Sequence, residues 1–250
     1  MCRFSRPVRS VSKTRIFARD TGSGGQILVY SMKLSAEEEL AMVLGIPVQP
    51  SAGDGALRFI DLSGYPDIFA ALDKGFPEPA VPQRPRRRGL LAAPTRAPLA
   101  VVPVGSFEAS YVPTIADFDR LDPRFRLPAG VLEAQPDQES FGFAVFKLKP
   151  GTHTIHPMAF EYPRADPSTL FFPTVHVHDG RVHPTAAFDH TFYYQRRTGE
   201  RDGAPSPWEE SLLSAQRFTE PRRSAGVIDP DLSVYRWKLR GNARNQDTYV

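Results

Sequence analysis

The chain has 250 residues, of which 41% are hydrophobic and 24% are charged, a composition typical of globular proteins and not of disordered ones. Its formal net charge is +3, and its arginines cluster in proline-rich stretches with few aromatic residues, which favours solvated loops over nucleic-acid contact. No apolar run approaches the ~20 residues of a membrane-spanning helix, so we expect no membrane partner.

Two further features indicate a compartment and a fold class. The basic N-terminus lacks the apolar segment of a secretory signal, and a single cysteine excludes an intramolecular disulfide, so we expect a cytoplasmic protein. The 25 prolines argue against long helices and for short strands joined by turns. We therefore predict an α+β fold that is mostly antiparallel β-sheet with a few short helices.

Two stretches of the chain resemble each other without a gap. LVYSMKLSAEEELAMVLGIPV starts at Leu28, and AVFKLKPGTHTIHPMAFEYPR starts at Ala144. Both read as a strand, a polar connection and a second strand ending at proline, and each is followed by a third apolar strand. This similarity predicts a duplicated three-strand unit within one domain. We divide the chain into a first β unit with a helix (14–76), an exposed insert rich in proline and arginine (77–98), a second β unit (99–195) and a C-terminal helix, strand and polar tail (196–250). The last ten residues, GNARNQDTYV, are polar, and we expect them to fray or to pack loosely.

Helix signals occur at three places in the chain. A short helix is expected from Pro66, ended by Gly75, and a helical turn is expected to begin at Thr114. The stretch SPWEESLLSAQRFTEP has Ser206 as N-cap with proline next to it, and gives the strongest helix signal of the chain. Beyond it, LSVYRWKL alternates apolar and polar residues, which predicts a half-buried strand.

All six histidines lie between positions 153 and 190. The stretch TVHVHDGRVHPT, which starts at Thr174, holds three of them and predicts a β-hairpin. Asp-Gly at positions 179 and 180 favours a two-residue type I′ turn, because both central positions of that turn need a positive φ. The turn places His176 directly opposite His183, and residues opposed in this way share a face of the sheet. His178 falls on the same face, and valines 175, 177 and 182 fall on the other.

Three imidazoles on one face are candidate ligands for a divalent metal such as zinc: His176, His178 and His183. Water in the fourth position would become a nucleophile for metal-assisted hydrolysis. His156, Asp189 and His190 are further candidate ligands. The alternative is an ordinary hairpin with valines inside and histidines in water. Arg181, expected opposite His178, favours that alternative because a guanidinium repels a divalent cation.

The N-terminus offers a second candidate site. Removal of Met1 would expose Cys2 as an N-terminal cysteine, whose amine can serve as the base for its own thiol. Met1 to Phe4 is similar to the start of class II glutamine amidotransferases, and this resemblance implies an N-terminal-cysteine amidohydrolase with Cys2 as nucleophile. The sequence contains no Asn-Gly-Asp-Gly segment of the kind that family uses, so Cys2 alone carries over.

A longer resemblance gives a fold without a reaction. QILVYSMKL, LRFIDLSGYPDIFAAL, YVPTIADFDRLDPRFRLP and LFFPTVHVHDG are together similar to a bacterial protein family of unknown function. That resemblance implies a β-rich cytoplasmic protein and supplies no site residue. A third function class therefore stands beside the two enzyme hypotheses: a non-catalytic binding or assembly module that presents sheet edges and the insert 77–98.

Overall fold

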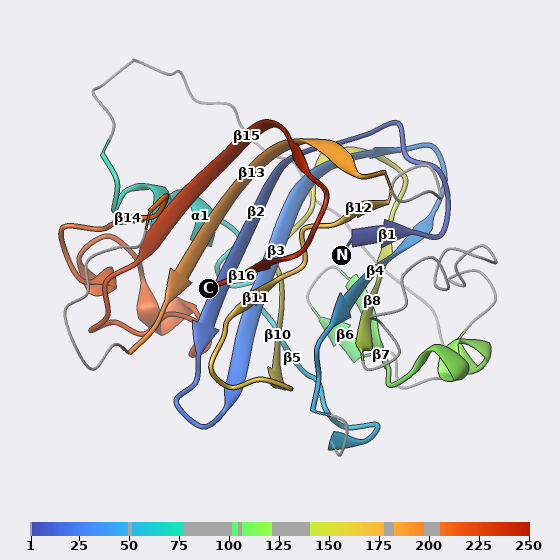
Figure 1. The fold of residues 1–250 in the computed structure, drawn as a ribbon, viewed down its shortest axis with the longest axis horizontal. Coiled ribbons are helices and arrows are strands. Elements are labelled where there is room, and N and C mark those ends of the chain that lie inside the picture. Colours follow the sequence, from blue (N-terminus) through green and yellow to red (C-terminus); the bar gives the residue numbers. More distant parts are fainter. Residues whose placement is uncertain are drawn as a thin grey trace.

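The computed structural model describes residues 2–49, 52–77, 102–104, 107–121, 141–177, 183–197 and 206–250. Within these ranges the protein is mostly β-sheet with few helices, as the sequence predicts. Two large sheets face each other, one of eight strands and one of six (Figure 1). Both are mixed, because β13 runs parallel to β2 and β12 runs parallel to β1, while the other strand pairs are antiparallel.

The eight-stranded sheet supplies the long strands of the fold. Along its path it contains β14 (Glu209–Glu210), β15 (Tyr235–Arg244), β13 (Thr185–Gln195), β2 (Ser10–Asp20), β3 (Gly25–Ala36), β10 (Met158–Pro163) and β5 (Arg58–Ile60), while β9 (Gly151–Thr154) pairs with β3. The predicted alternation of β15 is confirmed from Trp237 to Arg240, where residues are half-buried and exposed in turn.

The six-stranded sheet carries the N-terminus. Its strands, in order, are β12 (His176–Val177), β1 (Cys2–Phe4), β4 (Leu40–Ile46), β8 (Gly142–Leu148), β7 (Phe107–Val112) and β6 (Val102–Val104). A small separate sheet joins β11 (Phe171–Phe172) to β16 (Thr248–Tyr249) near the C-terminus.

The main hydrophobic core lies between the two large sheets. Leu28 of β3 and Phe160 of β10 contribute to it from one sheet, and Met42 of β4 and Phe146 of β8 contribute from the other. The outer faces are also covered. A second apolar cluster packs α1 (Ile68–Asp73) against the eight-stranded sheet, and a third packs η2 (Ile115–Arg120) against the six-stranded sheet. Both sheets are therefore buried on two faces, which explains runs such as β4 in which every residue is buried.

The first two predicted helices form where expected. Helix α1 occupies Ile68–Asp73 and buries Ile68, Phe69, Ala71 and Leu72 against the sheet. Gly75 lies two residues beyond its end, and a Cβ atom there would lie 2.6 Å from the ring of Phe218, so close packing favours glycine at this position. At the second place the chain forms the 3₁₀ helix η2, and the Thr114 hydroxyl donates to the Asp117 carboxylate at 2.7 Å.

The strongest helix signal was wrong. Residues 206–221 form the two-residue strand β14 and the short 3₁₀ helix η5 (Ala215–Arg217), followed by η6 (Pro221–Arg223), and the Ser206–Pro207 peptide bond is cis. Trp208 is buried among aromatic rings, and Glu209 binds Arg236 of β15 at 2.8 Å. The prediction of a helix rested on the local capping pattern, and these tertiary contacts outweigh it.

The predicted duplication is not confirmed. The first strands of the two related stretches are β3 and β8, which lie in different sheets, and each pairs with the second strand of the other stretch: β3 with β10, and β8 with β4. The third strands do not continue this exchange. Strand β5 pairs with β10, whereas β11 pairs with β16 at the C-terminus. The polar C-terminus is thus ordered by pairing rather than frayed, which corrects a second expectation. No helix among the described residues has the length and apolar character needed to cross a membrane.

Candidate functional site

Two of the predicted site residues contact each other. His176 of β12 and His190 of β13 approach with their Nε2 atoms 3.1 Å apart and their ring centroids 4.8 Å apart. His190 is fully buried between Phe188 and Phe192, while His176 is partly buried. The pair joins the edge strand of the six-stranded sheet to an interior strand of the eight-stranded one.

The backbone on both sides of this pair is fixed by side chains. Asn245 accepts the N–H of His176 at 2.8 Å and donates to its carbonyl at 3.0 Å. Arg240 donates to the carbonyl of His190 and to the hydroxyl of Thr191. The two imidazoles therefore extend from anchored backbone rather than from loop ends.

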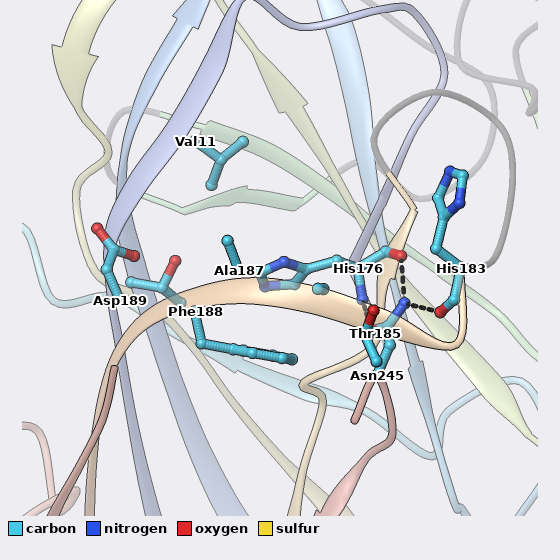
Figure 2. A pocket seen from close by; sticks show the side chains of 10 residues that line it. Val11, His176, His183, Thr185, Ala187, Phe188, Asp189 and Asn245 are labelled. Carbon is cyan, nitrogen blue, oxygen red and sulfur yellow. Dashed lines mark hydrogen bonds between the residues drawn. The ribbon is translucent and has the colours of Figure 1, made fainter. Parts of the chain in front are cut away.

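The backbone of His183 lies close to that of His176, but the two rings point in different directions. Asn245 also donates to the carbonyl of His183 at 2.9 Å, so one amide bridges the two residues. Figure 2 shows the ring of His183 pointing away from the ring of His176. Among the described strands the partner of β12 is β1, and His183 precedes β13 instead of pairing with His176. The turn at 179–180, and with it His178 and Arg181, lies outside the described residues.

The other candidate residues occupy three separate places. His156 lies between β9 and β10, and its ring lies 5.4 Å from that of Phe107. The carboxylate of Asp189 accepts the backbone N–H of Lys13 at 2.5 Å. Cys2 is a strand residue of β1, flanked by His176 on one side and Leu44 on the other. The register thus pairs the backbone of Cys2 with that of His176, although 174 positions separate the two in sequence.

A cavity of about 540 Å³ opens beside His176 (Figure 2). It lies in a fork between two neighbouring strands of the eight-stranded sheet. Strand β13 pairs with β15 from Thr185 onward but pairs with β2 only from Thr191, so its first residues leave β2 uncovered. Its lining residues are Val11, Thr14, His176, His183, Thr185, Ala186, Ala187, Phe188, Asp189 and Asn245.

A β-bulge in β2 shapes the fork. The pairing of β2 with β3 shifts between Ser12 and Arg15, and Lys13 within the bulge has a φ of 53°. Such left-handed backbone is uncommon for a residue other than glycine, and bulges are enriched next to functional sites. The Asp189 carboxylate holds the bulge through the N–H of Lys13. The cavity wall is therefore built from an irregular part of the sheet.

Those predicted metal ligands that the structure describes do not converge into one cluster. Within the ranges that the structure describes, no three or more histidine, cysteine, aspartate or glutamate side chains are grouped so as to hold a metal ion. In Figure 2, Asp189 and His183 lie at opposite ends of the cavity, with His176 between them. Among the predicted ligands that the structure describes, His176 and His190 are the two whose rings contact each other, and His178 lies outside the described residues.

A second polar cluster fixes the end of α1. Asp73, the last residue of the helix, accepts a hydrogen bond from the Tyr193 hydroxyl at 2.6 Å and pairs with Arg15 at 3.0 Å. Burial, and then the charge of Asp73, raises the pKa of Tyr193 above its ordinary value. Next along the chain, Phe76 packs against the guanidinium of Arg236 at 4.4 Å. The chain is thus anchored to the sheet immediately before the segment 77–98.

Sequence reasoning missed two residues that shape the cavity. Asn245 lies in a C-terminal stretch that we expected to fray, and its bridging role depends on contacts 62 to 69 residues away in sequence. Thr14 is 1% exposed inside a strand, where its type gives no functional signal. The period-two pattern of AFDHTF was the one available signal, since it places His190 on the same face as Phe188 and Phe192.

Comparisons with known proteins identify a fold but no family. No family model matches the chain, and no curated protein matches it. Among solved structures, the crystal structure of baculovirus P35 aligns with a TM-score of 0.52 and 13% identity over 96% of both chains. A mutated baculovirus P35 after caspase cleavage aligns with a TM-score of 0.47 and 12% identity, over 95% of this chain and 99% of that one. The caspase-8/P35 complex aligns with a TM-score of 0.45 and 13% identity, over 95% of both chains. The chain therefore has a fold similar to that of P35.

Proposed function

We propose that this chain is a non-catalytic protein-binding module whose partner is a peptidase. The observation that carries the proposal is the likeness to baculovirus P35, which extends over 96% of both chains and so includes the whole two-sheet architecture. Solved structures describe P35 after cleavage by a caspase and in a complex with caspase-8. Because the identity is 13%, the partner of this chain must be argued from its own residues.

The segment 77–98 is the part of the chain that we assign to partner contact. Its sequence is PEPAVPQRPRRRGLLAAPTRAP, with five arginines and no aspartate. The arginine run at 86–88 is followed by Gly-Leu-Leu, so a peptidase whose specificity pocket is acidic finds its preferred residue there. The chain is held in place just before this segment, because Asp73 binds the Tyr193 hydroxyl and Phe76 packs against Arg236. We therefore propose an arginine-directed peptidase as the partner class.

A segment replacement tests this assignment. Replacing residues 77–98 by a Gly/Ser linker of equal length should leave the thermal unfolding midpoint nearly unchanged and abolish co-elution with an arginine-directed cysteine peptidase in size-exclusion chromatography. The matched control is Arg96→Ala, which keeps the arginine run and should still co-elute. If the linker variant binds the peptidase as well as the wild-type chain does, the assignment of the segment is wrong.

An N-terminal-cysteine hydrolase is the second candidate function. The observation that favours it is the register of β1, in which Cys2 is the direct partner of His176. A thiol with an imidazole as its base is the usual arrangement of a cysteine nucleophile. This candidate requires removal of Met1, so the intact mass of the purified untagged chain tests it directly. Retention of Met1 would eliminate it, whereas its removal would call for assays of amide hydrolysis with a Cys2→Ser control.

A further inference from the structure

The contact between His176 and His190 has the spacing of two ligands that share one ion. Two imidazole nitrogens bound to a tetrahedral zinc-class ion at about 2.1 Å lie about 3.4 Å from each other. The Nε2 atoms of this pair lie 3.1 Å apart, within a few tenths of an ångström of that value. We propose that His176 and His190 form a two-histidine site for a divalent ion of the zinc class, with water from the adjacent cavity in its remaining positions.

The cavity beside the pair supplies a second, independent sign of a ligand. Thr14 lines the cavity and is 1% exposed, and its Oγ1 has no hydrogen-bond partner among the described residues. Buried hydroxyl groups are nearly always hydrogen-bonded, so this one indicates a polar ligand nearby. The parallel ladder between β2 and β13 ends at Arg15 and Thr191, so Thr14 and His190 are the next residue of each strand at its open end. Water bound to the ion in the cavity is the ligand that we assign to the Thr14 hydroxyl.

The two ligands are held in place before any ion binds. Asn245 fixes the backbone of His176 from both sides, and Arg240 fixes the carbonyl of His190. The rings are further held by Phe188, which lies 4.7 Å from the ring of His176 and 5.2 Å from that of His190. A preformed arrangement lowers the ordering cost of binding. The site opens to the cavity through His176, which gives an ion an entry path.

Imidazole ligands select zinc, copper, nickel or iron over magnesium and calcium. The probe is therefore Zn²⁺ alone, with Co²⁺ as its spectroscopic substitute, added to the full-length untagged chain at pH 7.5. We expect one equivalent of Zn²⁺ to bind in isothermal titration, and the thermal unfolding midpoint to rise with Zn²⁺ concentration because the ion binds the folded state. We expect Mg²⁺ to produce neither effect.

Single replacements decide which histidines hold the ion. His176→Gln and His190→Gln should each weaken Zn²⁺ binding by about tenfold or more and remove the rise in unfolding midpoint. His153→Gln is the matched control, since its side chain lies on β9 outside the site, and it should bind as the wild type does. His183→Gln tests the rim of the cavity and should also leave binding unchanged. The His176 variant keeps the buried His190 in place, so it gives a readout even if His190→Gln fails to fold.

Three results would overturn the proposal. The first is Zn²⁺ binding by the wild-type chain no stronger than that of the His176→Gln/His190→Gln double variant. The second is a loss of binding in His183→Gln equal to that in His176→Gln, which would assign the ion to the cavity rim. The third is an unfolding midpoint that does not respond to Zn²⁺. The site is independent of the proposed peptidase partner, and none of these measurements involves one.

Discussion

His176 and His190 meet at 3.1 Å across the boundary between the two large sheets, and His190 does so from a fully buried position. Replacing His190 by alanine leaves a cavity between Phe188 and Phe192 and removes the polar partner of His176. We expect this change to lower the free energy of unfolding by about 2–4 kcal/mol, measured by urea denaturation in the absence of metal. His153→Ala is the control and should stay within about 0.5 kcal/mol of the wild type. Equal effects of the two replacements would contradict the packing role of His190.

Because of the left-handed backbone at Lys13, we expect two replacements there to have different effects on the free energy of unfolding. Its φ of 53° is easy for glycine and strained for a β-branched residue. Lys13→Gly should therefore leave the free energy of unfolding unchanged or raise it by about 0.5 kcal/mol, whereas Lys13→Val should lower it by about 1 kcal/mol or more. Asp189→Ala, which removes the acceptor for the Lys13 N–H, should cost about 1–3 kcal/mol. A valine variant as stable as the glycine variant would rule out the left-handed conformation.

Trp208 is buried in the stretch where the sequence predicted a helix and where the chain instead forms β14 and η5. Its ring lies 4.7 Å from that of Tyr194, 5.7 Å from that of Trp237 and 5.8 Å from that of Phe172. Truncation to alanine should cost about 3–5 kcal/mol of unfolding free energy and shift the denaturation midpoint accordingly. Leu212 is 90% exposed in the same stretch, so Leu212→Ala should change the stability by less than about 0.5 kcal/mol. In the helix expected from the sequence, Trp208 and Leu212 would lie on the same face. Equal losses of stability in the two variants would therefore contradict the observed burial of Trp208 alone.

Two tyrosines, the half-buried Tyr111 and the buried Tyr194, predict how stability depends on alkaline pH. Burial raises the pKa of Tyr111 to about 12, assisted by the charges of Asp54 and Asp117, and burial also raises the pKa of Tyr194 to about 12. The unfolded chain releases these protons near pH 10, so the folded state binds more protons between pH 10 and 12. Stability should therefore be fully present below pH 10 and fall between pH 10 and 12. Tyr111→Phe and Tyr194→Phe should each reduce that slope in urea titrations, and an unchanged slope in both variants would contradict the shifts.

Local patterns predicted some elements correctly because tertiary contacts agree with them. Helix α1 has apolar residues on its buried face and a glycine after its end, and β15 alternates between half-buried and exposed residues from Trp237 to Arg240. The stretch after Ser206 carries equally good capping residues but folds around Trp208, since burying that ring in an aromatic cluster outweighs a helix cap of about 1 kcal/mol. Local propensity does not show whether the helix cap or the burial of Trp208 contributes more to stability.

The candidate site was predictable only in its residue types. The histidine window correctly indicated where imidazoles gather, but turn chemistry assigned His183 as the neighbour of His176, whereas the ring contact is with His190. Strand β12 pairs with the N-terminal strand β1 in the six-stranded sheet, and from there the ring of His176 contacts that of His190 on β13. Pairings between distant segments of this kind leave no local trace in a single sequence, and the same is true of the Asn245 bridge.

The most direct test of the central claim is a titration of the purified chain into an arginine-directed cysteine peptidase, with residual activity on a small fluorogenic substrate as the readout. We predict loss of peptidase activity at about one equivalent of chain, because the arginine run would occupy the specificity pocket of the peptidase. The triple change Arg86→Ala, Arg87→Ala and Arg88→Ala should abolish this inhibition, and Arg96→Ala should preserve it. Full peptidase activity at a large excess of wild-type chain, whether that chain is left intact or degraded as an ordinary substrate, would contradict the account.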